Sequence, residues 1–304
     1  AMMKRNLMKG SVIPRYSGLP TVLKENGYYN LFFMTHEGQY DNMNAFFRTN
    51  GYDEVFSQED YPADKVVNSF GVQDDFLYDY AIPVLNQRAA TGEPFFATLL
   101  SISNHPPYVI PPFFHPKTSE PETQIVEYAD WALRQFFEEA RKQPWFDNTI
   151  FVLEGDHGKL VGDAECELPE SYNHIPLMLY SNRIQPEEKT TFGGQVDIQP
   201  TILGLLNIDY LQNNFGVALL KEERPCMFYT ADNMVVGRND TLLYLYNYET
   251  QQELTYDIGN GKLNAVPMDD SFFPLKEYSF SMLQSAEFLV KHGKTLNSIP
   301  FTQQ

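Results

Sequence analysis

Apolar residues form short unbroken runs along the first two thirds of the chain, and amphipathic segments separate them. The runs cover residues 28–34, 95–103, 149–153 and 175–180. Continuous runs of this length are typical of parallel strands buried on both faces. Helical spacing of apolar residues predicts helices over residues 19–26, 74–88, 121–140 and 198–206. The alternation predicts an α/β fold, a three-layer α/β/α sandwich around a mainly parallel sheet.

The pattern changes after Arg224. Short runs at residues 227–229, 234–236 and 241–248 are separated by turn residues, which predicts a small antiparallel β appendage. A closing helix is predicted over residues 280–290. We therefore expect two domains, an α/β domain over residues 1–222 and a small β subdomain with its closing helix over residues 223–304.

Composition excludes several classes of protein. The 304 residues carry a net charge of −18, so the clustered lysine and arginine that bind nucleic acid are scarce, and we expect no nucleic-acid partner. An anionic partner would need a metal ion or a local basic pocket. The two cysteines have no metal-ligand spacing, and no apolar stretch approaches the ~18 residues of a membrane span.

One strand end carries the residues for metal chemistry. The run at residues 149–153 leads into Glu154-Gly155-Asp156-His157-Gly158. Asp156 offers an oxygen and His157 a nitrogen to one divalent cation, while the glycines let the backbone turn sharply. Taken alone, an Asp-His dipeptide is a weak signal, and a solvated loop is then the favoured interpretation.

Three of the six histidines, His36, His105 and His157, come just after predicted strands. Parallel strands bring their carboxyl ends to one edge of a sheet, so we expect these side chains to converge on a cation held by Asp156 and His157. His36 and His105 could then donate hydrogen bonds to anionic substrate oxygens or a leaving group. Taken singly, His36 is better explained by packing, and His105 is undecided.

Other polar residues have competing explanations. Asp41 and Asn42 either project into the cleft or stabilise a turn. His174 precedes a strand and is a candidate for a second layer around the metal, although a structural role is favoured. Asp197 is expected to cap the following helix. His115 and His292 are expected to be exposed to solvent.

Five segments together resemble the lipoteichoic acid synthase branch of the sulfatase and alkaline phosphatase superfamily. They occur in the order of that family and span residues 19–206 approximately. They are His36 with Tyr40-Asp41-Asn42-Met43, Ser103-Asn104-His105-Pro106-Pro107, Gly155-Asp156-His157-Gly158, His174-Ile175-Pro176-Leu177 and Gly194-Gln195-Val196-Asp197-Ile198-Gln199-Pro200-Thr201.

The resemblance implies a role for each site residue. Asp156 and His157 would bind a manganese, magnesium or zinc ion, His105 would act on the phosphoryl group, and His36, Asp41 and Asn42 would line the substrate pocket. The reaction implied is transfer of phosphoglycerol from an anionic phospholipid or glycolipid head group through a phospho-threonine. Related enzymes hydrolyse sulfate or phosphate esters.

The chain departs from the family at its beginning. Members carry a nucleophilic threonine or serine and an acidic metal ligand upstream of the matched segments, and Ser11, Ser17 and Thr21 do not match the nucleophile motif. We therefore expect an amino-terminally truncated chain that folds in large part but is inactive alone. By resemblance, upstream membrane helices would anchor the parent protein at the extracytoplasmic face of the cell membrane.

Two functions follow from these observations. The first is an extracytoplasmic, metal-dependent phosphoglycerol transferase, or a sulfatase-like or phosphodiesterase-like enzyme. The alternative is a non-catalytic module of the same fold that binds an anionic glycolipid or a protein partner. The intact pair of Asp156 and His157 favours the enzyme.

Overall fold

The computed structural model describes residues 8, 13–160 and 162–296, which divide into two compact units between Thr149 and Ile150. We call the part up to Thr149 the first unit and the part from Ile150 the second unit. The domain boundary expected near residue 222 lies inside the second unit and stays a prediction. No helix in the described ranges is long and apolar enough to cross a membrane.

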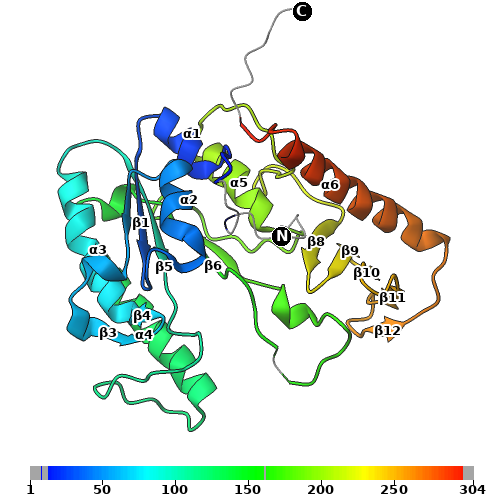
Figure 1. The fold of residues 1–304 in the computed structure, drawn as a ribbon, viewed down its shortest axis with the longest axis horizontal. Helices are drawn as coiled ribbons and strands as arrows, with labels where there is room; N and C mark the ends of the chain where they lie inside the picture. The colour runs from blue at the N-terminus through cyan, green and yellow to red at the C-terminus, as the bar shows by residue number, and fades with distance from the viewer. Residues whose placement is uncertain (1–7, 9–12, 161, 297–304) are drawn as a thin grey trace, which may run out of the picture. The chain divides into compact units, whose positions relative to one another are not determined.

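A parallel sheet forms the centre of the first unit (Figure 1). Strand β1 (Tyr29–Met34) lies between β2 (Glu54–Phe56) and β5 (Phe95–Leu100). In the pairing of β1 with β5, Tyr29 lies opposite Phe95 at the start of the strands and Met34 lies opposite Leu100 at their end. All residues of β1 after Tyr29 are buried, as the continuous apolar run predicts.

Helices cover both faces of this sheet. Phe32 stacks on Phe47 of α2 with 4.0 Å between ring centroids. Phe33 points to the opposite face, where it stacks on Phe56, which in turn contacts Tyr80 of α3. Helix α4 packs on α3. The helices of this unit are α1 (Leu19–Glu25), α2 (Met43–Thr49), α3 (Asp74–Ala89) and α4 (Pro121–Ala140).

The second unit begins with a strand pair that differs from the expectation. Strand β6 (Phe151–Glu154) pairs with β7 (Leu177–Tyr180) in antiparallel orientation, so the prediction of β7 as a further parallel strand is wrong. A parallel return needs a crossover of a dozen or more residues, usually a helix. The described residues between these strands hold only a 3-10 turn, Glu170–Tyr172, and the chain therefore turns back beside β6.

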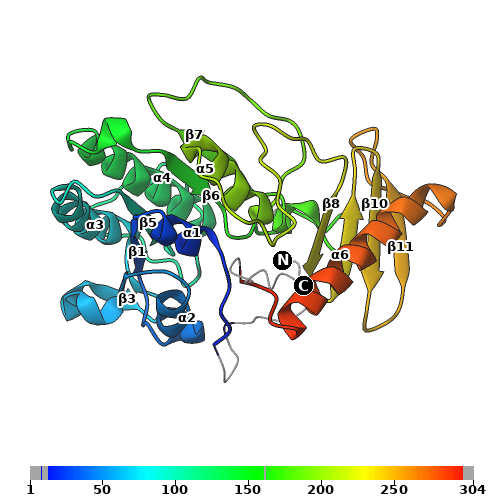
Figure 2. The ribbon, with the colours of Figure 1, turned by 90° about the horizontal axis from the view of Figure 1, so that it is seen from above.

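An antiparallel sheet and a long helix complete this unit, as the sequence predicts. Helix α6 (Phe273–Lys291) packs on β8 and β9 (Figure 2). It begins at Phe273 rather than residue 280, because Pro274 in its first turn is a helix-start signal. The other elements are α5 (Ile198–Leu206), β8 (Met227–Ala231), β9 (Met234–Arg238), β10 (Leu242–Asn247), β11 (Glu253–Asp257) and β12 (Asn264–Ala265).

Candidate functional site

The first unit brings His36 and His105 to the same end of its sheet. His36 follows β1 and His105 follows β5, and these strands are parallel neighbours. The ring of His36 lies 4.7 Å from Tyr40, Tyr40 lies 6.4 Å from Phe70, and Phe70 lies 4.2 Å from His105, measured between ring centroids. The rings of Tyr40 and Phe70 therefore connect the two histidines.

The two imidazoles have the same hydrogen-bond arrangement but different exposure. Nδ1 of His36 lies 3.1 Å from the carbonyl oxygen of Glu37, and Nδ1 of His105 lies 2.9 Å from that of Pro106. A carbonyl only accepts, so Nδ1 carries the hydrogen and Nε2 is left for a ligand. His105 is exposed, whereas His36 is 2% exposed, so the substrate-binding role of His36 stays a prediction.

Asp41 and Asn42 form a left-handed turn before α2. Their φ angles are 48° and 62°, a conformation that asparagine and aspartate tolerate better than most residues. The Asn42 side-chain amide donates to the carbonyl oxygen of Met8 at 3.2 Å. The turn role weighed from the sequence is thus present, and a contact of either side chain with substrate stays a prediction.

A hairpin formed by β3 (Val66–Asn68) and β4 (Gly71–Val72) holds the ends of both histidine-bearing strands. The Asn68 amide donates to the carbonyl oxygen of Pro107 at 3.3 Å. On the other side, the backbone N–H of Val72 donates to the carbonyl oxygen of Thr35 at 3.2 Å. The hairpin therefore fixes the backbone beside both imidazoles.

Asp74 anchors the segment that leads to His105, and the sequence interpretation did not identify it. Its carboxylate accepts hydrogen bonds from the backbone N–H groups of Ile102 and Ser103 at 2.9 and 3.0 Å. Burial raises the pKa of Asp74, and these two hydrogen bonds act in the opposite direction. An aspartate in the first turn of a helix is common, so the local pattern gives no sign of this second role.

We predict that Gly71→Ala destabilises the first unit. Gly71 has a φ of +89°, and an added Cβ would lie 1.7 Å from the carbonyl oxygen of Thr35, so the backbone must move. Strain and overpacking together give an expected loss of about 2–5 kcal/mol in the free energy of unfolding, measured by urea denaturation.

Gly92→Ala is the matched control for this prediction. Gly92 has a φ of +77°, and nothing lies within 4 Å of an added Cβ. It therefore tests the left-handed conformation without the clash, at an expected cost of about 1–2 kcal/mol. Equal losses in the two variants would contradict the close approach of Gly71 to Thr35.

The candidate metal ligands Asp156 and His157 lie together in the second unit. Nε2 of His157 lies 3.6 Å from Oδ2 of Asp156, and the side chains are 69% and 71% exposed. Nδ1 of His157 lies 2.8 Å from the carbonyl oxygen of Gly158, so it carries the hydrogen and leaves the Nε2 lone pair for a ligand. Two donors of one tetrahedral ion, each about 2.1 Å from it, lie about 3.4 Å apart. The spacing of Nε2 and Oδ2 therefore fits two of the four ligand positions around one tetrahedral ion.

No third ligand stands beside this pair within residues 13–160 and 162–296, where no group of three or more His, Cys, Asp or Glu could hold a metal ion. His174 is exposed, and its backbone N–H donates to the carbonyl oxygen of Glu170 at 2.8 Å. Its role near the metal stays a prediction. His36 and His105 belong to the other unit, so the expected convergence on one cation also stays a prediction.

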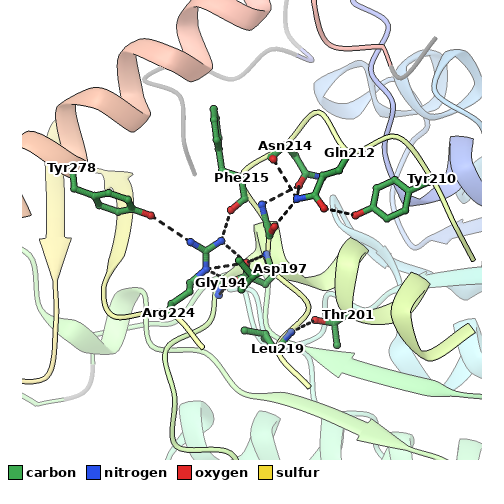
Figure 3. Close-up of polar contacts among 12 residues, drawn as sticks. Gly194, Asp197, Thr201, Tyr210, Gln212, Asn214, Phe215, Leu219, Arg224 and Tyr278 are labelled. Carbon is green, nitrogen blue, oxygen red and sulfur yellow. Dashed lines mark hydrogen bonds and ion pairs between the residues drawn. The ribbon is translucent and has the colours of Figure 1, made fainter. Parts of the chain in front are cut away.

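Asp197 is the N-cap residue of α5 as the sequence predicts, but its side chain does not serve as the cap and makes no cap hydrogen bond there. The carboxylate is fully buried and accepts from the backbone N–H groups of Gly194 and Val217 at 2.9 and 2.8 Å. Arg224 pairs with it from 27 positions along the chain, with Nη2 2.5 Å from Oδ1 (Figure 3). A buried carboxylate needs this charge partner, which local sequence does not reveal.

The family model for sulfatases matches residues 3–208. The chain belongs to the sulfatase family. Lipoteichoic acid synthase 1 of Bacillus subtilis is 25% identical over 270 residues, which are 81% of this chain and 40% of that protein. Phosphoglycerol transferase I of Xanthomonas campestris is 24% identical over 242 residues, 76% of this chain and 34% of its own. The chain thus spans less than half the length of these relatives, within the lipoteichoic acid synthase-like branch of the superfamily.

Solved structures agree with this family. A protein of the alkaline phosphatase superfamily from Vibrio parahaemolyticus superposes with a TM-score of 0.81 at 26% identity, covering 96% of this chain and 72% of that one. The lipoteichoic acid synthase LtaP from Listeria monocytogenes gives a TM-score of 0.75 at 20% identity, covering 96% and 75%. The second likeness supports the fold alone.

Proposed function

We propose that this chain is part of a metal-dependent enzyme that transfers phosphoglycerol from a lipid head group, or hydrolyses a related phosphate or sulfate ester. The relatives include lipoteichoic acid synthases and a phosphoglycerol transferase, which supports the ester chemistry. The observation that carries the proposal is the spacing of His157 Nε2 and Asp156 Oδ2, 3.6 Å, with Nδ1 of the same imidazole occupied by the carbonyl oxygen of Gly158.

Each residue has a proposed task that fits its own surroundings. Asp156 and His157 hold a manganese, magnesium or zinc ion, which when bound supplies Lewis-acid polarisation of a phosphoryl or sulfuryl oxygen and activates a hydroxyl nucleophile. His105, exposed and with Nδ1 already donating to the carbonyl oxygen of Pro106, presents its Nε2 to the phosphoryl group. His36, Asp41 and Asn42 are proposed to line the substrate pocket.

Asp156 and His157 alone do not make a complete metal site. Two donors are fewer than the four ligands of a typical zinc site, so at least one further ligand is needed. We propose that the whole protein supplies an acidic ligand and a nucleophilic hydroxyl. We therefore expect the 304-residue chain alone to turn over no phosphodiester. The whole protein is proposed to act at the extracytoplasmic face of the cell membrane on an anionic phospholipid or glycolipid.

Substrate choice tests this function directly. The full-length gene product is incubated with fluorescent phosphatidylglycerol in one reaction and an aryl sulfate in another, with Mn²⁺ or with EDTA. We expect release of fluorescent diacylglycerol in Mn²⁺ and none in EDTA. Turnover of the sulfate alone would make the protein a sulfatase, and turnover of neither, with retained glycolipid binding, would favour the non-catalytic module.

A further inference from the structure

Residues 155–158, which we call the metal-ligand turn, contain Asp156 and His157 and have no regular secondary structure. A few contacts therefore determine the shape of this turn. Gly158 lies against the segment before β7, where its N–H donates to the carbonyl oxygen of Tyr172 at 2.8 Å. A Cβ at Gly158 would lie 1.9 Å from the carbonyl oxygen of Ser171. These contacts fix the far end of the turn, after His157. At the near end, the Gly155 N–H donates to the carbonyl oxygen of Pro176 at 3.4 Å, while the carbonyl oxygens of Gly155 and Asp156 accept from another partner.

That partner is the side-chain amide of Gln195. Its Nε2 donates to the carbonyl oxygen of Asp156 at 2.8 Å and lies 3.4 Å from that of Gly155. The carbonyls belong to consecutive residues, so one amide group sets the orientation of both peptide planes. The direction of the Asp156 carboxylate depends on this backbone, because the side chain leaves from the same Cα atom.

Gln195 is exposed, and an exposed hydrogen bond by itself contributes little to stability. The backbone of Gln195, however, is held rigidly. This residue begins the 3-10 turn Gln195–Asp197, whose last residue is the buried Asp197. The Asp197 carboxylate accepts from the N–H groups of Gly194 and Val217 and pairs with Arg224 (Figure 3). The amide of Gln195 is therefore presented from a fixed base, which lowers the entropy cost of its hydrogen bonds.

We propose that Gln195 is a positioning residue for the metal ligands, holding the backbone of Asp156 so that its carboxylate and the Nε2 of His157 face one cation. This inference rests on the proposed function. Partners that orient metal ligands are worth about 10–100-fold in metal affinity. Gln195 acts through the backbone of Asp156 and does not itself contact the ion.

Gln195→Met tests this role, because methionine keeps the length of the side chain and removes both N–H donors. Mn²⁺ is titrated into the full-length gene product, and paramagnetic broadening of the histidine ring protons is followed by NMR. In the unchanged chain we expect His157 to broaden at lower Mn²⁺ than the exposed His115 and His292. In Gln195→Met we expect the midpoint for His157 to rise about 10–100-fold while the metal-free melting temperature stays unchanged.

Gln252→Met is the matched control, since Gln252 is an exposed glutamine in the turn between β10 and β11 of the same unit. Its midpoint should equal that of the unchanged chain. A Gln195→Met midpoint within twofold of the unchanged chain, with binding abolished in His157→Ala, would overturn the positioning role and leave the proposed function standing. Absence of preferential broadening at His157 in the unchanged chain would overturn both.

Discussion

Replacing His157 with alanine is expected to lower kcat/KM for phosphodiester transfer by the full-length protein about 10³-fold or more, a loss of about 4 kcal/mol in transition-state stabilisation. The Nε2 of His157 is half of the described donor pair, and its neighbour Asp156 alone gives one oxygen. Metal content, measured by elemental analysis of the same samples, should fall together with activity.

His115→Ala is the control, because His115 is an exposed histidine in a loop that carries none of the proposed ligands. Its activity and metal content should match those of the unchanged protein. A His157→Ala protein that keeps more than a tenth of the activity and its full metal content would show that the cation does not depend on this imidazole, and the assignment of the pair would be wrong.

Arg224→Met is expected to destabilise the second unit by about 3–5 kcal/mol, because it leaves the Asp197 carboxylate buried without its charge partner. The side chains of Asp197 and Arg224 are 0% and 6% exposed. Arg224 Nη2 also donates to the carbonyl oxygen of Phe215, and Nη1 lies 3.4 Å from the hydroxyl of Tyr278 on α6. The free energy of unfolding by urea measures the loss.

A second substitution separates the buried charge from lost packing. Asp197→Asn in the Arg224→Met background removes the unpaired charge while its side-chain oxygen can still accept from Gly194 or Val217, so stability should partly recover. Arg134→Met, which breaks the exposed ion pair with Asp130, should cost less than about 1 kcal/mol. An Arg224→Met loss no larger than that of Arg134→Met would refute the importance of the buried pair.

The elements that the sequence predicted well are those whose burial is regular. The continuous apolar run of β1 and the amphipathic pattern of α4 record how each element contacts the core, so their positions follow from local spacing. The orientation of β7 did not follow, because a buried strand has the same apolar pattern in either direction. Orientation depends on the connection, and the described residues between β6 and β7 form turns in place of a crossover helix.

The candidate site shows the same difference between features that follow from local sequence and contacts that form between distant residues. The sequence predicts His105, Asp156 and His157 as site residues because a polar residue at the end of an apolar strand is a local pattern. It missed Asp74 and Gln195, and it misassigned the side chain of Asp197. Asp74 acts on residues 28 and 29 positions away, and the Gln195 amide reaches a carbonyl 39 positions away. Such pairings have no periodicity in the sequence.

The sequence by itself determined the α/β class, the family and the residue types that can hold a cation, because apolar periodicity and short motifs are properties of neighbouring residues. Only the tertiary structure decided which Nε2 atoms are left for a ligand, which carboxylates are buried and which side chains hold the metal-ligand turn. Those properties depend on distances between atoms that folding brings together and on the water that it excludes.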